Sequence, residues 1–198
     1  MDKLLTNKDT PATASAIHNE LLLVKAQLND LIAEARQNQE IMQRHQTLDL
    51  QLIGSQSFRE LIRHIFVTLA DICELDQVTL CLLNSQHNLK EMLADLKIDS
   101  SEFPYLLFAE SETELQQYGK PLRKALVGPY ETKEHQRWFD PYPDQPNSVA
   151  IIPLIRQSKL LGSLNLGSDH PDRFASDMGT DFIERLGSII AKIGRAHV

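Results

Sequence analysis

The stretch SVAIIPLIRQSKLLGSLNLGS, Ser148 to Ser168, decides how the fold of this chain is interpreted. Two apolar runs flank the polar tetrapeptide RQSK, a pattern typical of a β-hairpin. The second run holds Gly162 and Gly167, whose separation matches that of the two glycines in a phosphate-binding loop. The residues around these glycines must therefore distinguish a strand from a nucleotide-binding loop.

A phosphate-binding loop places a lysine directly after its second glycine, because the lysine neutralises phosphate charge. Here Ser168 follows Gly167 directly, and the lysine is missing. The residues between the glycines, SLNL, alternate as in a strand, so that the two leucines share a face with Gly162. We interpret KLLGSLNLGSDHPDRF, Lys159 to Phe174, as a strand that runs into a turn, in which Gly162 permits a close neighbour and Gly167 lets the chain bend toward DHPDRF.

A second strand is predicted at Gln77–Asn84, with the sequence QVTLCLLN. In both strands one face is apolar and the other carries small polar groups. We expect the apolar face to pack on helices and the mixed face to line a cavity, because small-molecule sites combine apolar walls with a few polar groups. The alternative is that these small side chains only fit a tight layer. The candidate cavity residues are Thr79, Cys81, Ser163 and Asn165.

The N-terminal part of the chain is predicted to be a dimerising helix. Residues 1–14 are polar, contain Pro11 and are expected to be disordered, whereas residues 15–53 form one long helix. Its apolar residues recur at steps of four and three, as in a coiled coil, and this narrow stripe needs a partner in water. We expect a homodimer, most simply a parallel one, although the stripe leaves orientation open; alternatively, the helix folds back on its own domain. The predicted interface residues are Ile17, Leu21, Val24, Leu28, Leu31, Ala35, Asn38 and Met42.

Residues 55–194 are predicted to form a single domain. The tetrapeptide SFRE, Ser57–Glu60, is a capping box that opens a helix with a broad apolar face. Six prolines break residues 98–147 into short elements and loops, and a last helix follows Ser176. Helices at both ends of a group of strands predict an α+β fold.

The order of these elements resembles a GAF domain, and the residues that carry the resemblance are SVAIIPLIRQSKLLGSLNLGSDHPDRFASDMGTDFIERLGSIIAKI, Ser148–Ile193. Over residues 15–193 the chain is similar to a bacterial GAF-like family of unknown function with an N-terminal coiled-coil helix, whose members also occur ahead of diguanylate cyclase domains. The resemblance implies a central antiparallel sheet with helices on one face and a loop-covered ligand pocket on the other. No motif selects a cyclic nucleotide or a covalently bound tetrapyrrole, and a fold does not determine its ligand.

The segment YETKEHQRWFDPYP, Tyr130–Pro143, holds further candidate ligand-binding residues: Tyr130, Arg137 and Trp138. The tryptophan can stack on a ligand while the arginine pairs with an anion. Alternatively, the aromatic residues pin a long loop to the domain, since this is the single tryptophan of the chain.

Composition excludes several classes of function. A formal net charge of −7 disfavours nucleic acid or an anionic membrane as a partner, and no apolar run approaches the length of a membrane span. The N-terminus lacks a secretory signal, so we expect a cytoplasmic protein in which Cys73 and Cys81 are reduced and buried.

The seven histidines form no metal-binding pair, and no nucleophile motif is present, so we expect neither a metal, nor a cofactor, nor catalysis. The predicted function is a sensory or regulatory module, with a small-molecule ligand of unknown identity and an output domain or partner protein. The alternative is a ligand-free dimeric scaffold for protein–protein interaction.

Overall fold

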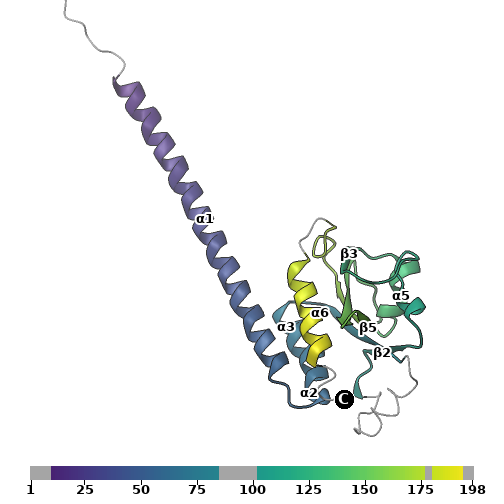
Figure 1. Ribbon diagram of the computed structural model, residues 1–198. Helices are drawn as coiled ribbons and strands as arrows, with labels where there is room; N and C mark the ends of the chain where they lie inside the picture. The colour runs from purple at the N-terminus through teal and green to yellow at the C-terminus, as the bar shows by residue number, and fades with distance from the viewer. Residues whose placement is uncertain (1–9, 85–101, 177–179, 194–198) are drawn as a thin grey trace, which may run out of the picture. The chain divides into compact units, whose positions relative to one another are not determined.

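The computed structural model describes residues 10–84, 102–176 and 180–193, and for residues 10–17 the backbone alone. The chain divides into two compact units, Met1–His45 and Gln46–Val198. The predicted long helix is confirmed as α1 (Thr10–Ile53), which crosses from the first unit into the second (Figure 1). It begins within the segment predicted to be disordered, of which residues 1–9 lie outside the described residues. Pro11 is compatible with the first turn because N–H groups there lack intrahelical acceptors.

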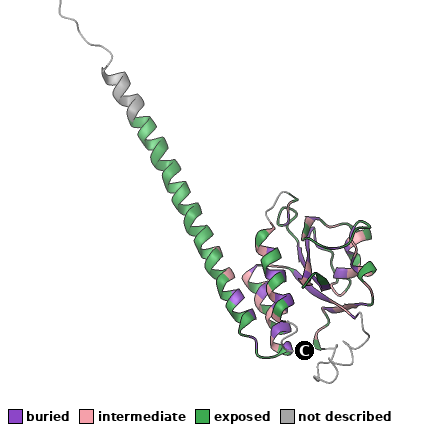
Figure 2. Cartoon of the chain, in the orientation of Figure 1, coloured by how far each residue is buried: buried purple, intermediate pink, exposed green. Residues whose placement is uncertain are grey.

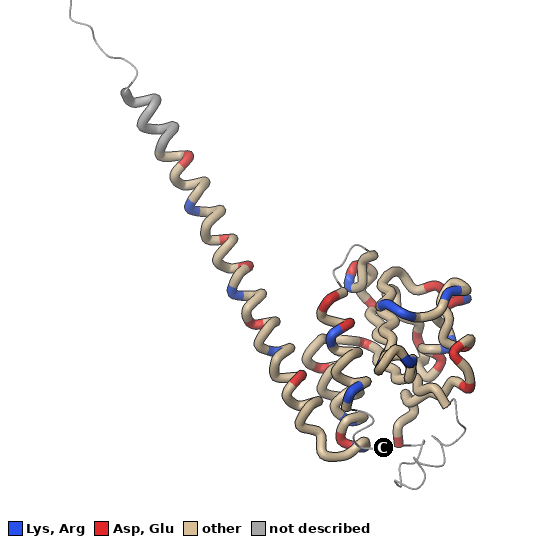
Figure 3. Tube along the Cα trace, in the orientation of Figure 1, with Lys and Arg blue, Asp and Glu red and all other residues tan. Residues whose placement is uncertain are grey.

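The predicted stripe of α1 is exposed in the single chain (Figure 2). Leu21, Leu28, Leu31 and Met42 are 63%, 54%, 62% and 61% exposed, whereas the side chain of Ile17 lies outside the described residues. Acidic and basic residues are interspersed along the same helix (Figure 3). The first unit therefore presents large apolar side chains to solvent at helical spacing.

The second unit is built on a five-stranded sheet in the order β2-β1-β5-β4-β3, which confirms the α+β class. The pairs β1–β5, β5–β4 and β4–β3 are antiparallel, but β1 and β2 are parallel, so the sheet is mixed rather than wholly antiparallel. A parallel neighbour needs a long crossover, and residues 84–105 between these strands are long enough for one. The strands are β1 (Gln77–Leu83), β2 (Leu106–Ala109), β3 (Leu126–Pro129), β4 (Ser148–Arg156) and β5 (Lys159–Ser168).

The predicted hairpin is the pair β4 and β5. Its turn residues Gln157 and Ser158 both have positive φ, at 47° and 64°, as the twist of a two-residue hairpin turn requires. Gly162 lies in β5 opposite Leu82, and a Cβ there would fall 2.0 Å from the carbonyl oxygen of Cys81. The predicted close approach at Gly162 is confirmed, and the approaching segment is strand β1.

Gly167 has a different role from the predicted one. The strand continues through it to Ser168, and a Cβ at Gly167 would lie 3.0 Å from side-chain atoms of both Phe139 and Pro146. The glycine makes room for these two residues instead of bending the chain. Both glycines belong to a paired strand, as predicted, and neither forms part of a phosphate-binding loop.

One face of the sheet carries the main hydrophobic core. Figure 1 shows α2 (Phe58–Arg63), α3 (Ala70–Ile72) and α6 (Asp181–Ile193) on this side, and the π-helix η1 (His64–Leu69) joins α2 to α3. The predicted apolar strand face is confirmed, because its residues are buried in this core together with two residues from the last turns of α1. These buried residues include Leu48, Leu52, Val78, Leu80, Ala150, Ile152, Leu154, Leu164 and Leu166.

Local interactions set where the helices on this face begin and how α1 is held. The Ser57 hydroxyl accepts a hydrogen bond from the Glu60 backbone N–H at 3.2 Å, and Gln56 N–H donates to the Glu60 carboxylate at 2.8 Å. The predicted serine cap opens α2, whereas the glutamate reaches back to Gln56, one residue further than in a regular capping box. Arg185 of α6 forms an ion pair with Asp49, whose side chain is only 8% exposed. The end of α1 is thus joined to α6 by charge as well as by apolar packing.

Candidate ligand-binding site

The opposite face of the sheet carries the four residues predicted to line a cavity, and we call it the covered face. The register of β1 and β5 sets Thr79 opposite Asn165 and Cys81 opposite Ser163. All four side chains have an exposed fraction of 0%. Residues far apart in the sequence therefore form one small, buried group with two hydroxyls, a thiol and an amide.

The cover over this face consists of α5 (Thr132–Phe139), the 3₁₀-helix η3 (Glu112–Leu115) and their connections. Trp138 is fully buried, so it anchors α5 to the sheet, in agreement with the interpretation of this segment as a pinned loop. A second hydrophobic core results, separated from the first by the sheet. Its buried members are Cys81, Ala109, Leu115, Leu122, Trp138, Phe139, Val149, Ile151 and Leu160.

Arg137 joins the two parts of the cover. Its guanidinium donates to the backbone oxygen of Glu114 at 2.7 Å and to the carboxylate of Glu114 at 2.9 Å. It also lies 4.6 Å from the centre of the Trp138 ring. The hydrogen bond from Arg137 holds the pKa of Glu114 below its ordinary value. The anion predicted to pair with Arg137 is thus, in this chain, a carboxylate of η3.

Tyr130 lies at the edge of the cover, half-buried against the second core. Its ring centre is 5.8 Å from that of His135 and 6.2 Å from that of Phe139. The Glu131 backbone N–H donates to Nδ1 of His135 at 2.9 Å, and burial lowers the pKa of His135, which favours a neutral imidazole. Tyr130, Arg137 and Trp138 therefore belong to one layer above the predicted cavity residues.

Four buried side chains on or near the covered face keep polar atoms without a hydrogen-bond partner among the described residues. These atoms are Ser163 Oγ, Asn165 Oδ1, Trp138 Nε1 and both amide atoms of Gln117. Asn165 satisfies only its nitrogen, which donates to the Thr79 hydroxyl at 3.0 Å. A buried polar group without a partner costs about 1–3 kcal/mol. Such a concentration of unpaired groups favours a bound molecule or ordered water at this face.

Cys81 lies among these groups but is a poor nucleophile. Burial raises the pKa of its thiol to about 12, with a smaller opposing effect from Arg137. Because the thiolate is the reactive form, Cys81 acts as a small apolar residue at neutral pH. Neither Cys73 nor Cys81 is in a disulfide within the described part of the chain, and both are buried, as predicted. Among the described side chains, no cluster of histidine, cysteine or carboxylate residues has the arrangement of a metal site.

Sequence reasoning found the strand residues and the tryptophan but missed Glu114, Gln117 and His135. Glu114 and Gln117 lie in the proline-broken region, whose short elements have no periodicity to show which side chains point inward. His135 lies in a cluster of charged and aromatic residues that assigns it no role. The nearest signal was its spacing of three residues from Trp138 on one short helix, which places both on the same side.

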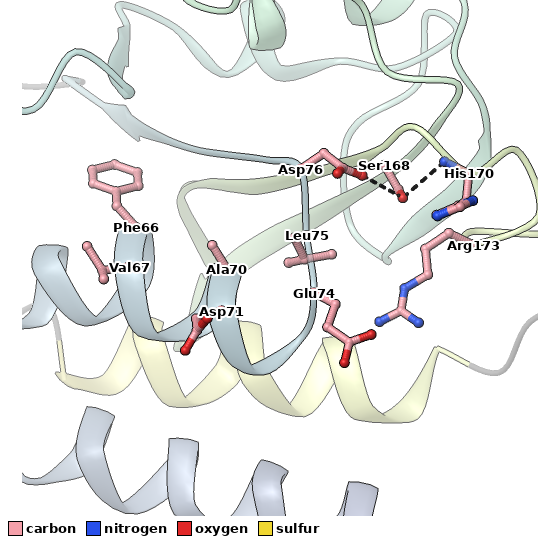
Figure 4. A pocket seen from close by; sticks show the side chains of 10 residues that line it. All are labelled: Phe66, Val67, Ala70, Asp71, Glu74, Leu75, Asp76, Ser168, His170 and Arg173. Carbon is pink, nitrogen blue, oxygen red and sulfur yellow. Dashed lines mark hydrogen bonds between the residues drawn. The ribbon is translucent and has the colours of Figure 1, made fainter.

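A separate open groove of about 670 Å³ lies at the end of the sheet where β1 begins and β5 finishes (Figure 4). Asp76 forms one wall by accepting from Ser168 Oγ at 3.0 Å and from Asp169 N–H at 2.8 Å, and these bonds lower its pKa. Arg173 donates to the Cys73 backbone oxygen at 2.6 Å. These polar side chains connect β1, β5 and α3 to one another, so the groove is better explained as a structural junction.

Comparisons with known proteins give a family for nearly the whole chain but no curated relative. None of the curated proteins compared with this chain matches it. Within the described residues, no helix has the length and apolar character needed to cross a membrane. The sequence profile of one family, described as "Protein of unknown function, DUF484", matches residues 14–195, which include all but the first four residues of α1 and the whole sheet. The chain therefore belongs to the DUF484 family.

Proposed function

We propose that this protein is a non-catalytic, GAF-like regulatory module that binds a small uncharged molecule between the covered face and α5. The observation that carries the proposal is the set of unpaired polar atoms on Ser163, Asn165, Trp138 and Gln117. In a protein interior such atoms are almost always satisfied, and a ligand that supplies the missing partners would be retained for that reason.

The chemistry of these atoms defines the class of ligand. The indole N–H of Trp138 and the amide N–H₂ of Gln117 are donors, whereas the free oxygens of Asn165 and Gln117 are acceptors. All of them are neutral, and the nearby charge of Arg137 is already paired with Glu114. Burying an ion here would lack a counter-charge. We therefore assign to this face a neutral ligand with both donor and acceptor groups.

The sheet supplies a route from the ligand to the helices. Thr79 faces the cover while the adjacent Leu80 faces the main core, so a shift of β1 acts on both sides. On the helix side, Leu48, Leu52 and the Asp49–Arg185 ion pair tie the end of α1 to α6 and the sheet. A ligand that favours one position of the cover would thereby bias the position of these helices. An output domain or a cytoplasmic partner protein would respond to that change.

The proposed module acts as a homodimer through α1. The support for this is the exposed stripe of Leu21, Leu28, Leu31 and Met42, which a single chain leaves in water. A dimer would place the signal from the covered face at the end of a paired helix.

The ligand can be tested directly on protein purified without denaturation. We expect acid or solvent extraction followed by mass spectrometry to release one small uncharged compound in near-equimolar amount. Asn165→Leu and Ser163→Ala remove unpaired atoms and should abolish or reduce this recovery. Gln136→Ala is the matched control, because Gln136 is exposed on the same cover helix.

A thermal-shift series with nicotinamide, adenine and uracil provides a second measurement, since each offers neutral donors and acceptors. A wild-type extract without any stoichiometric compound, together with no shift from these probes, would contradict ligand binding.

The second candidate is a ligand-free dimeric scaffold. It is favoured by the complete burial of Thr79, Cys81, Ser163 and Asn165 beneath Trp138. Under this hypothesis ordered water satisfies the free polar atoms, and Asn165→Leu would leave partner binding unchanged.

A further inference from the structure

We infer that two copies of α1 pair in parallel and in register, so that each residue of the stripe meets its own counterpart. This rests on the proposed homodimer and adds the orientation, which the apolar spacing alone leaves open. The occupant of the exposed stripe is a second copy of this chain. The argument comes from Asn38 and from the charges beside the stripe.

The stripe corresponds to positions a and d of a heptad repeat. Between Leu21 and Met42, position d is polar once, at Asn38, while every position a is apolar. Positions a are Leu21, Leu28, Ala35 and Met42, and positions d are Val24, Leu31 and Asn38. Most of their neighbours at positions e and g are polar, which makes the stripe narrow and suited to two strands.

Asn38 distinguishes the two orientations. In an antiparallel pair a position d packs against a position a of the partner helix, so Asn38 would meet leucine, alanine or methionine. In a parallel pair in register, Asn38 packs against the partner's Asn38, and the two amides can donate to each other. A shift by one heptad would set Asn38 against Leu31 and lose this bond. The amide therefore favours parallel helices at one register.

The flanking charges favour the same orientation. Among residues 18–41, positions g carry the acids Glu20 and Glu34 and no base, whereas positions e carry the base Lys25 and no acid. An antiparallel pair brings g against g and e against e, so opposite charges never meet across it. A parallel pair brings g against the e that follows five residues later, so Glu20 meets the partner's Lys25 twice by symmetry.

Glu20 and Lys25 do not pair within one helix, because residues five apart lie on different sides of it. Both are exposed, and the pattern of acid at g and base at e is useful only between two chains. This charge pattern selects the orientation of the two helices more than it strengthens their association.

Cysteine crosslinking of the full-length chain tests the orientation. Leu21→Cys and Met42→Cys each place a thiol at a position a, and these two positions lie about 30 Å apart along the helix at about 1.5 Å per residue. In a parallel pair in register both variants should form a disulfide-linked dimer under mild oxidation. Glu40→Cys, on the side away from the stripe, is the matched control and should not crosslink. The native Cys73 and Cys81 are buried, and the wild-type chain measures how much crosslinking they give by themselves.

The outcomes separate orientation from dimerisation. In an antiparallel pair a position a faces a position d of the partner helix, so Leu21→Cys and Met42→Cys cannot both crosslink with their own copies, and at least one of them gives no disulfide-linked dimer. That result overturns the proposed orientation. A wild-type mass of one chain by light scattering overturns the homodimer itself.

A charge exchange gives a second test that does not depend on crosslinking. Glu20→Lys and Lys25→Glu should each weaken dimerisation by roughly 2- to 10-fold at low salt, because each sets like charges against one another. The double variant Glu20→Lys with Lys25→Glu should recover most of the wild-type affinity. Absence of recovery overturns the parallel register.

Discussion

Asn165 donates a hydrogen bond to the hydroxyl of Thr79 at 3.0 Å, while the amide oxygen of the same asparagine has no partner among the described residues. The two residues are 86 positions apart and face each other across strands β5 and β1. This half-satisfied pair joins the fold to the proposed function. Its hydrogen bond contributes to stability, whereas its free oxygen is the acceptor that the proposed ligand would engage.

Thr79→Val should destabilise the protein by about 2 kcal/mol, because the Asn165 amide nitrogen would then be buried without an acceptor. Urea unfolding followed by circular dichroism measures this change. The double variant Thr79→Val with Asn165→Leu should be more stable than the single one, since no polar atom of the pair remains unpaired. Equal losses in the single and double variants would contradict the hydrogen bond.

Gly162→Ala should be severely destabilising, by about 3 kcal/mol, because its Cβ would fall 2.0 Å from the carbonyl oxygen of Cys81. Gly128→Ala is the matched control, since Gly128 lies in strand β3 of the same sheet and an added Cβ there meets nothing within 4 Å. Its stability should change by less than about 0.5 kcal/mol. Similar losses at both glycines would argue against the close approach of β1 and β5.

Arg137→Met should loosen the cover, because it removes both hydrogen bonds to Glu114 and retains most of the apolar stem. We expect faster amide hydrogen exchange in Glu112–Leu115 and unchanged exchange in β4. Arg123→Met is the control, since its ion pair with Glu112 is longer, at 3.3 Å, and both side chains are about half exposed. Identical exchange in the two variants would show that Arg137 has no special role.

Acid should weaken the contact between Arg137 and Glu114. Arg137 lowers the pKa of Glu114 from its ordinary value of 4.5 in the folded protein, so the ionised form is favoured by folding. The stabilisation is fully present above that ordinary value and is lost as the pH falls through the folded-state pKa below it. Unfolding midpoints measured between about pH 6 and pH 3 should therefore fall less steeply for Arg137→Met than for the wild type. If the unfolding midpoints of the two proteins fell equally with pH, the contribution of the Glu114 carboxylate to stability would be contradicted.

Leu28→Lys should halve the mass measured by light scattering, because it buries a charge in the proposed helix pair. Ala26→Lys, on the side of α1 away from the stripe, should leave the mass unchanged. If neither variant changes a dimeric mass, the association is not through α1.

Local patterns in the sequence were sufficient for much of the fold. The alternation after the turn RQSK, the turn itself and the serine cap at Ser57 each predict a structure from neighbouring residues, and each is found. The same alternation assigns Leu164 and Leu166 to one face and Asn165 to the other, because side chains in a strand point alternately to its two faces.

The parallel pairing of β2 and the composition of the cover were not predictable in this way. Glu112–Leu115 is too short to show a period, and in Thr132–Phe139 only His135, Trp138 and Phe139, at spacings of three and four, mark the buried side. The sequence suggests an anion from outside the chain as the partner of Arg137, because it does not show that Glu114 lies beside this arginine.

The sequence by itself determined the α+β class, the long helix with its apolar stripe, and the strand faces, since all of these depend on residues that are close along the chain. Only the tertiary structure decided that Thr79 lies opposite Asn165, that Trp138 closes the covered face, and that polar atoms there remain unpaired. Register and packing depend on contacts between distant segments, and these contacts exist only after the chain has folded.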